Sequence, residues 1–154
     1  MPRLAVYQPD IALNLGAMIR LSACFGAPID VIEPCGFPFS RRALRRSAMD
    51  YLDLAQLFHW PSWERFLEER PAGRLALLTT AADADPIWSA QFMESDVFIV
   101  GRESAGAPPE VHQAADLRLR IPTAAGARSL NVVTAAAIAL GEAARQLQEK
   151  NERA

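Results

Sequence analysis

Three short polar clusters hold the side chains of this 154-residue chain that could do chemistry. They span Asn14 to Arg20, Gly101 to Pro108, and Ile121 to Asn131. Together they supply three guanidinium groups, a carboxylate, two carboxamides and three hydroxyl groups, which can bind a polar ligand through hydrogen bonds. Each cluster follows or replaces an apolar run, as ligand-binding loops do at the carboxyl ends of parallel strands.

Taken singly, each cluster also has an ordinary structural interpretation. Asn14 could cap one helix, and Ser129 with Asn131 could cap another. Arg102 and Glu103 could be solvated surface charges. The elements that position the clusters therefore matter as much as the residues themselves.

Five apolar runs predict short strands. The first four are nearly continuous Leu, Ile, Val, Ala and Phe, which is typical of strands covered on both faces. The sequence therefore predicts an α/β domain in which helices flank a parallel sheet. The five runs are Leu4–Tyr7, Ile29–Ile32, Leu75–Leu78, Val97–Val100 and Leu117–Ile121.

Helices are predicted between these strands. The first spans Asn14 to Gly26, with asparagine as its cap and glycine at its end. Ser62 begins an amphipathic helix, and Pro108 precedes a short one. The last helix begins near Leu130 and is rich in small residues, which allows close packing, including against a second subunit. We expect residues 149–154 to fray.

The composition indicates one globular domain over residues 1–154, because 51% of the residues are hydrophobic and 22% are charged. The longest charge-free stretch near the C-terminus, Ser129 to Gly141, has 13 residues. A membrane-spanning helix needs about 20. Gln8, Pro9 and Asp10 stand where an export signal would need apolar residues. We therefore expect a cytoplasmic protein with no membrane segment.

Metal and redox sites have no support in the sequence. Cys24 and Cys35 do not form a Cys-x-x-Cys pair, and His59 and His112 do not form a His-Glu-x-x-His pair. We expect buried free thiols and no metal.

Three other familiar sites are excluded. The chain has no phosphate-binding Gly-x-x-x-x-Gly-Lys-Ser/Thr loop, and no glycine-rich turn follows its first strand. Arg102 precedes Ser104 by two residues, where the nucleophile elbow of a serine hydrolase needs glycine.

Charge is unevenly distributed along the chain. Residues 1–50 and 111–154 each carry a net charge of +2, whereas residues 51–110 carry −6. A net charge of −2 argues against general polyanion binding, but basic residues from the two ends could form one patch that holds phosphates.

In combination, the three clusters resemble the motifs of the SPOUT superfamily of RNA 2′-O-ribose methyltransferases over nearly the whole chain. Those motifs are Asn-x-Gly-x-x-x-Arg, Gly-x-Glu-x-x-Gly, and Ile-Pro followed by Ser-Leu/Met-Asn. Further segments resemble the branch of small single-domain tRNA (cytidine/uridine-34 2′-O)-methyltransferases. They are Tyr7-x-Pro9, Ile32-Glu33-Pro34-x-Gly36-Phe37, Leu44-Arg45-Arg46-x-x-x-Asp50-Tyr51 and Leu78-Thr79-Thr80.

The resemblance implies a deep C-terminal trefoil knot, a homodimer with active sites completed across the interface, and S-adenosylmethionine (AdoMet) as methyl donor. S-adenosylhomocysteine would be the product. In the family, backbone groups of the three knot loops hold the cofactor, and Gly101 would let the backbone approach it closely. The corresponding positions here are Leu78, Thr79, Gly101, Ile121, Ser129 and Leu130.

The resemblance also implies the catalytic residues, which are Asn14, Arg20, Glu103, Ser129 and Asn131. A ribose 2′-hydroxyl must attack the sulfonium methyl in line, and positioning can supply about 7 to 11 kcal/mol of the barrier. The arginine has been proposed as the base in the family, but a guanidinium stays protonated in proteins. Our hypothesis is that Arg20 clamps the phosphate beside the target ribose, while the other four residues align the hydroxyl and hold the loops.

For the substrate, the resemblance points to the wobble nucleotide of a tRNA. Phosphate contacts are expected from the basic residues Arg41, Arg42, Arg45, Arg46 and Arg128, for which a solvated helix face is the alternative. Gly141 precedes Glu142 where the wobble-position branch often has tyrosine, so another tRNA position or ribosomal RNA stays an alternative target. The alternatives from other classes are a catalytically silent RNA-binding module of the same fold and a flavodoxin-like binder of small ligands.

Overall fold

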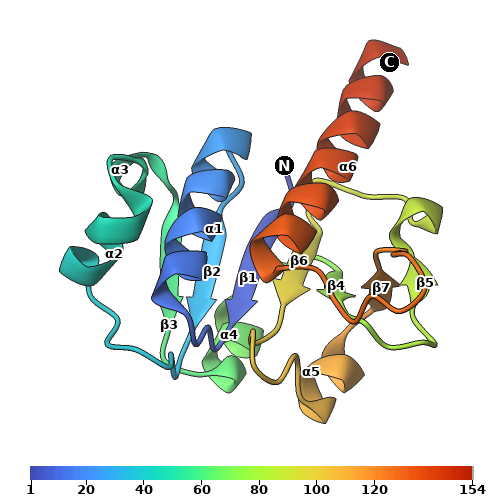
Figure 1. Ribbon diagram of the computed structural model, residues 1–154. Coiled ribbons are helices and arrows are strands. Elements are labelled where there is room, and N and C mark those ends of the chain that lie inside the picture. The colour runs from blue at the N-terminus through green and yellow to red at the C-terminus, as the bar shows by residue number, and fades with distance from the viewer. Residues whose placement is uncertain (154) are drawn as a thin grey trace.

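The computed structural model describes residues 1–153 and is built around one parallel sheet of seven strands (Figure 1). The strand order is β3-β2-β1-β6-β4-β7-β5, and every adjacent pair is parallel. The carboxyl ends of all strands therefore lie at one edge. The strands are β1 (Arg3–Tyr7), β2 (Ile29–Ile32), β3 (Leu57–Trp60), β4 (Leu75–Leu78), β5 (Asp85–Pro86), β6 (Val97–Val100) and β7 (Leu117–Arg120).

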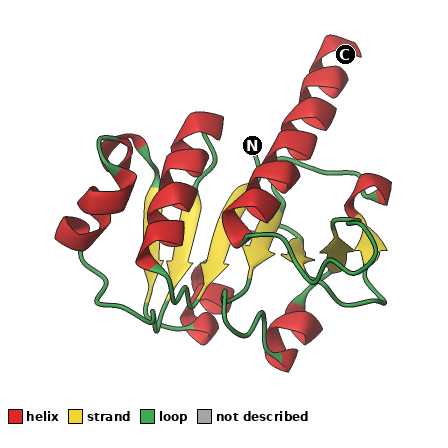
Figure 2. Cartoon of the chain, viewed as in Figure 1, coloured by secondary structure: helices red, strands yellow, loops and turns green. Residues whose placement is uncertain are grey.

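Helices cover both faces of the sheet (Figure 2). One face packs against α1 (Ala12–Phe25), α2 (Arg41–Ala48), α3 (Tyr51–Leu54), α6 (Val132–Arg153) and the short 3-10 helix η1 (Ile87–Ser89). The other face packs against α4 (Trp63–Glu69) and α5 (Pro109–Ala114).

The central strand β1 shows why its sequence is apolar throughout. Leu4 and Val6 point into the core beneath α1 and α6, whereas Ala5 and Tyr7 belong to the second core, with Trp63 of α4. All four side chains are buried. The expectation of a parallel sheet between two layers of helices is thereby confirmed.

All five predicted strands are present, but β3 and β5 were not predicted. Phe58 and His59 of β3 are exposed at the edge of the sheet, so β3 lacks a continuous apolar run. β5 has only two residues, Asp85 and Pro86, at the opposite edge. Edge strands with exposed polar side chains give little hydrophobic signal.

The helix ends agree with the predictions at Gly26 and Ser62. Gly26 ends α1 in a left-handed conformation with φ of 63°, and the Ser62 hydroxyl accepts a hydrogen bond from the Arg65 amide at 3.3 Å. The prediction that Asn14 caps α1 is wrong, because the helix already begins at Ala12. α6 begins at Val132 and continues to Arg153. The fraying expected over residues 149–154 stays a prediction, and residue 154 lies outside the described residues.

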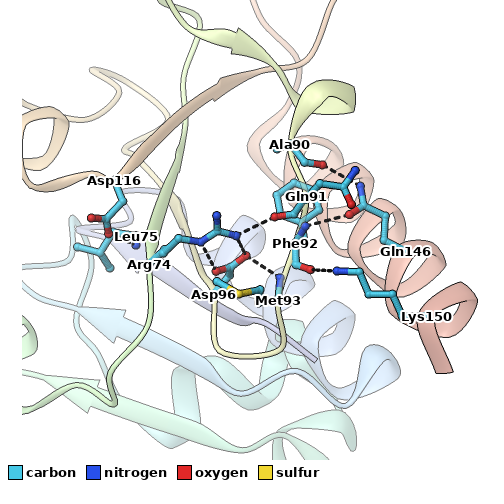
Figure 3. Close-up of polar contacts among 10 residues, drawn as sticks. All are labelled: Arg74, Leu75, Ala90, Gln91, Phe92, Met93, Asp96, Asp116, Gln146 and Lys150. Carbon is cyan, nitrogen blue, oxygen red and sulfur yellow. Dashed lines mark hydrogen bonds and ion pairs between the residues drawn. The ribbon is translucent and has the colours of Figure 1, made fainter. Parts of the chain in front are cut away.

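The second half of α6 is tied to the segment before β6 (Figure 3). The buried Gln146 carboxamide accepts from the Phe92 amide at 2.9 Å and donates to the Ala90 carbonyl at 3.0 Å. The same segment accepts from Arg74, which also pairs with the fully buried Asp96 carboxylate at 2.8 Å. These bonds set the position of α6, whose first turn contributes to the candidate site.

Helix packing is closest between α1 and α2. A Cβ atom on Gly16 would lie 2.1 Å from the Ser47 hydroxyl oxygen, so only glycine permits this approach. Ser47 donates to the carbonyl groups of Ala12 and Leu44 at 3.4 and 3.2 Å. Within residues 1–153, no helix combines the length and apolar character needed to cross a membrane.

Candidate functional site

A cavity of about 890 Å³ opens at the carboxyl ends of β4, β6 and β7. The segments that follow these three strands form most of its wall, and Ile11 and Asn14 from the start of α1 complete it. Small-molecule sites usually measure about 300 to 1,000 Å³. The cavity is lined by every residue for which a cofactor contact was expected, namely Leu78, Thr79, Gly101, Ile121, Ser129 and Leu130.

A chain of hydrogen bonds joins the three polar clusters at the cavity wall. The Asn14 carboxamide donates to Glu103 Oε1 at 3.1 Å, and the Asn131 carboxamide donates to Asn14 Oδ1 at 3.4 Å. Asn131 Oδ1 in turn accepts from the backbone amides of Val133 and Thr134 at 2.8 and 3.3 Å. Asn131 therefore caps α6 and links it to α1 and to the loop after β6.

Asp10, which the sequence analysis did not select, holds Glu103 from the other side. The Asp10 amide donates to Glu103 Oε2 at 3.0 Å, and the Glu103 amide donates to Asp10 Oδ1 at 3.2 Å. The Ser104 hydroxyl also donates to Asp10. The available signal in the sequence was that Asp10 lies in the short segment after the first strand, because the other clusters also follow strand ends.

The pKa values of the Asp10 and Glu103 carboxyl groups are shifted in opposite directions. Hydrogen bonding to Glu103, followed by the bond from Ser104, lowers the pKa of Asp10 to about 2. Burial raises the pKa of Glu103 above its usual value, and hydrogen bonding with Asp10 raises it further. Asp10 therefore carries the negative charge of the pair more readily than Glu103 does.

The loop after β6 folds back on itself through Gly101. The Arg102 amide donates to the Gly106 carbonyl at 3.0 Å, and the Gly106 amide donates to the Arg102 carbonyl at 2.9 Å. A Cβ atom on Gly101 would lie 2.4 Å from the Gly106 carbonyl carbon and 2.5 Å from the Ala107 nitrogen. Glycine at position 101 is therefore needed for the loop to close on itself, in addition to the close approach to the cofactor that was expected from the sequence.

The arginines expected at the site are not all in one place. Arg128 lines the cavity, as do Arg102 and Arg120, whereas Arg20 does not. The Arg20 guanidinium lies 4.8 Å from the centre of the Tyr51 ring on α3, in a cation–π contact. The four arginines of α2 are exposed and lie outside the cavity wall.

No group of three or more His, Cys, Asp or Glu side chains within residues 1–153 is arranged to hold a metal ion. Cys24 is exposed, contrary to the expectation of two buried thiols, and Cys35 is half-buried. Burial raises the pKa of the Cys35 thiol to about 12, so it stays protonated.

The parallel sheet, the position of the cavity and the three linked clusters define an α/β protein whose candidate ligand site lies at the carboxyl ends of its strands. The chain belongs to the SpoU rRNA methylase family, which matches residues 1–141.

Individual relatives agree with this family. The chain is 48% identical over 144 residues, 93% of this chain and 91% of that protein, to the tRNA (cytidine(34)-2′-O)-methyltransferase of Ancylobacter novellus. It is similar to a solved structure that concerns 2-OH methylation of C/U34 on tRNA, with a TM-score of 0.90, 36% identity and 97% of each chain covered. An AdoMet-bound rRNA methyltransferase from Sinorhizobium meliloti matches with a TM-score of 0.83 and 30% identity, over 95% of this chain and 56% of that one.

Proposed function

We propose that this chain is an AdoMet-dependent tRNA methyltransferase of the cytoplasm that modifies the 2′-hydroxyl of the wobble nucleotide, cytidine or uridine 34. The observation that carries the proposal is the cavity at the strand ends, lined by all six positions expected to hold the cofactor. The 48% identity to a tRNA (cytidine(34)-2′-O)-methyltransferase over most of both chains supports the choice of substrate.

The cavity fits AdoMet in size and in chemistry. Its wall combines apolar side chains, such as Leu78 and Ile121, with hydroxyl groups and exposed loop backbone. These groups suit a ligand with an adenine ring, a ribose and an amino-acid end. Leu78, Thr79, Gly101, Ile121, Ser129 and Leu130 would hold it.

When bound, AdoMet supplies an electrophilic methyl group on a sulfonium. The residues of this chain then position the attacking ribose and hold the walls of the site rigid, so that the two reactants meet in line. Asn14, Glu103 and Asn131 form one hydrogen-bonded unit, and Ser129 lies on the same wall. In our proposal this unit aligns the 2′-hydroxyl.

Arg20 does not line the cavity of its own chain, and this supports a homodimeric enzyme in which it serves the other protomer. We propose that the Arg20 guanidinium of one protomer reaches the cavity of its partner and clamps the phosphate beside the target ribose. Leu13, on the same helix, exposes 73% of its surface, and α6 has many small residues. Both helices therefore have side chains suited to a dimer interface.

We also propose that the C-terminal segment forms the trefoil knot of the superfamily. The strand order supports this topology. The chain leaves β4 for β5 at the sheet edge, returns to β6 on the other side of β4, and then inserts β7 between β4 and β5 before α6 crosses to α1.

The function is tested by incubating unmodified total tRNA with the purified protein and AdoMet, followed by mass spectrometry of nucleosides and RNase fragments. We expect a new 2′-O-methyl group in the anticodon fragment of a few tRNAs, and none with the Arg20→Ala variant. Methyl transfer to another tRNA fragment or to ribosomal RNA would refute position 34 while keeping the reaction.

Absence of transfer to total tRNA and to ribosomal RNA, with AdoMet binding shown by calorimetry, would refute the enzyme and favour a silent RNA-binding module. Ribosomal RNA is retained as the second substrate because the AdoMet-bound rRNA methyltransferase of Sinorhizobium meliloti shares the fold at 30% identity.

A further inference from the structure

The four arginines of α2 differ in their surroundings although all are exposed. Arg41 and Arg45 lie on one side of the helix and both bind the Asp53 carboxylate of α3, at 3.2 and 3.1 Å. Arg45 contacts both oxygens of that carboxylate. One acidic group thus balances part of the charge of this pair and holds both side chains against α3.

Arg42 and Arg46 lie one turn apart on another side of α2, beside the start of α1. They line a depression of about 370 Å³, hereafter the α1–α2 hollow, together with Ala12, Leu13 and Ser47. Neither guanidinium forms a hydrogen bond or ion pair with another side chain or backbone group among residues 1–153, and no acidic side chain lines the hollow.

The hollow has rigid walls. The Ser40 hydroxyl accepts from the Ala43 amide at 3.1 Å and so begins α2 at a defined residue. Leu44 is buried on the core side, and the close contact of Gly16 with Ser47 sets α2 directly against α1. The two guanidinium groups therefore extend from a fixed helix, which reduces the entropy lost on binding an anion.

The hollow also adjoins the cavity proposed for AdoMet. Ile11 and Asn14 line the cavity, whereas Ala12 and Leu13, which lie between them in the sequence, line the hollow. The two sites are thus separated by the first turn of α1, and a helix is about 10 Å wide.

We infer that the α1–α2 hollow binds a backbone phosphate of the RNA strand that carries the target nucleotide, through Arg42 and Arg46. Arg41 and Arg45 take no part in this contact. This inference rests on the proposed function and divides the set of four arginines, for all of which RNA contact was expected from the sequence.

The chain supplies a matched control, because both pairs lie on the same helix and carry the same charge. We would compare Arg42→Gln/Arg46→Gln with Arg41→Gln/Arg45→Gln. The probe is the unmodified transcript of the tRNA that the wild-type protein methylates most. Its dissociation constant is measured by fluorescence anisotropy between 50 and 300 mM KCl, and AdoMet binding and oligomeric mass are measured for each variant.

We expect the Arg42/Arg46 variant to bind tRNA about tenfold or more weakly at 100 mM salt, with a salt slope smaller by about one unit. The Arg41/Arg45 variant should stay within about twofold of wild type, and AdoMet affinity should be unchanged in both. A further variant, Arg42→Lys/Arg46→Lys, should keep the wild-type salt slope because it keeps the charge.

Equal losses in the two glutamine variants, or a loss confined to Arg41 and Arg45, would overturn the inference. So would an Arg42/Arg46 variant whose oligomeric mass changes, because the pair would then belong to a protein interface. A wild-type protein that methylates no tRNA would instead refute the proposed substrate, so the two failures are distinguishable.

Discussion

Replacement of Gly101 by alanine tests whether closure of the loop after β6 controls cofactor binding. The new Cβ atom would lie 2.4 and 2.5 Å from backbone atoms of Gly106 and Ala107. Carbon atoms in favourable contact are about 3.5 to 4.0 Å apart, so the loop must move by about 1 Å. Overpacking of this kind costs about 1 to 3 kcal/mol.

The same displacement should weaken AdoMet binding. Residues 101–103 and 105–107 line the cavity, and the Glu103 carboxylate of this loop accepts a hydrogen bond from Asn14. If AdoMet needs the wild-type loop position, the overpacking cost appears in binding, as a loss of about 5- to 150-fold in affinity. The assay is isothermal titration calorimetry with AdoMet, together with unfolding in urea.

Gly26→Ala is the matched control for this experiment. Gly26 has φ of 63° at the far end of α1, so alanine there costs about 1 to 2 kcal/mol of stability without reaching the cavity. Its AdoMet affinity should equal that of the wild type. A Gly101→Ala protein that binds AdoMet within twofold of the wild type would refute the role assigned to the loop closure.

Three further predictions follow from the contacts described above. If Arg20 acts across a dimer, a 1:1 mixture of Arg20→Ala and Glu103→Ala chains refolded together should recover about a quarter of wild-type methyl transfer. The reason is that about half of the dimers are mixed and one of the two sites in each mixed dimer is intact. No recovery would place Arg20 in the site of its own chain. Asp10 has a pKa lowered to about 2, so its contribution to stability is present above the unfolded pKa near 4 and is lost as the pH falls to 2. The melting temperature of the wild type should therefore fall more steeply between pH 4 and pH 2 than that of Asp10→Asn, as followed by circular dichroism, and parallel curves would contradict this assignment. Gln146→Ala leaves the buried Phe92 amide and the half-buried Ala90 carbonyl without their side-chain partner and should lower the unfolding free energy by about 2 to 4 kcal/mol. Gln148→Ala, at an exposed position of the same helix, should change it by less than about 0.5 kcal/mol. Similar urea midpoints for the two variants would disprove the anchoring role of Gln146.

Local patterns predicted the elements whose signal lies in neighbouring residues. Continuous apolar runs such as Val97–Val100 indicated strands covered on both faces, and the structure buries all four of these side chains. Gly26 and Ser62 marked helix ends because their conformational and hydrogen-bonding properties act over one turn. The edge strand β3 was not predicted because His59 interrupts the apolar run of its four residues.

The placement of the site residues depended on contacts between distant segments. Asn14 suits a helix cap by residue type, yet its carboxamide binds Glu103, which is 89 positions away in the sequence. Asp10 had no motif to mark it, and its role became visible only where the loops after β1 and β6 meet. The pairing of Arg41 and Arg45 with Asp53 depends on how α3 turns back along α2.

The sequence by itself determined the class of fold and the residues of the three motifs, because hydrophobic periodicity and residue type are local properties of the chain. Only the tertiary structure decided the strand order, in which β6 lies between β1 and β4 and so brings the loops together at one edge. It also decided that Arg42 and Arg46 line the α1–α2 hollow, whereas Arg41 and Arg45 are held by Asp53. The physical reason is that hydrogen bonds and ion pairs act over about 3 to 4 Å in space, a separation that distance along the sequence does not specify.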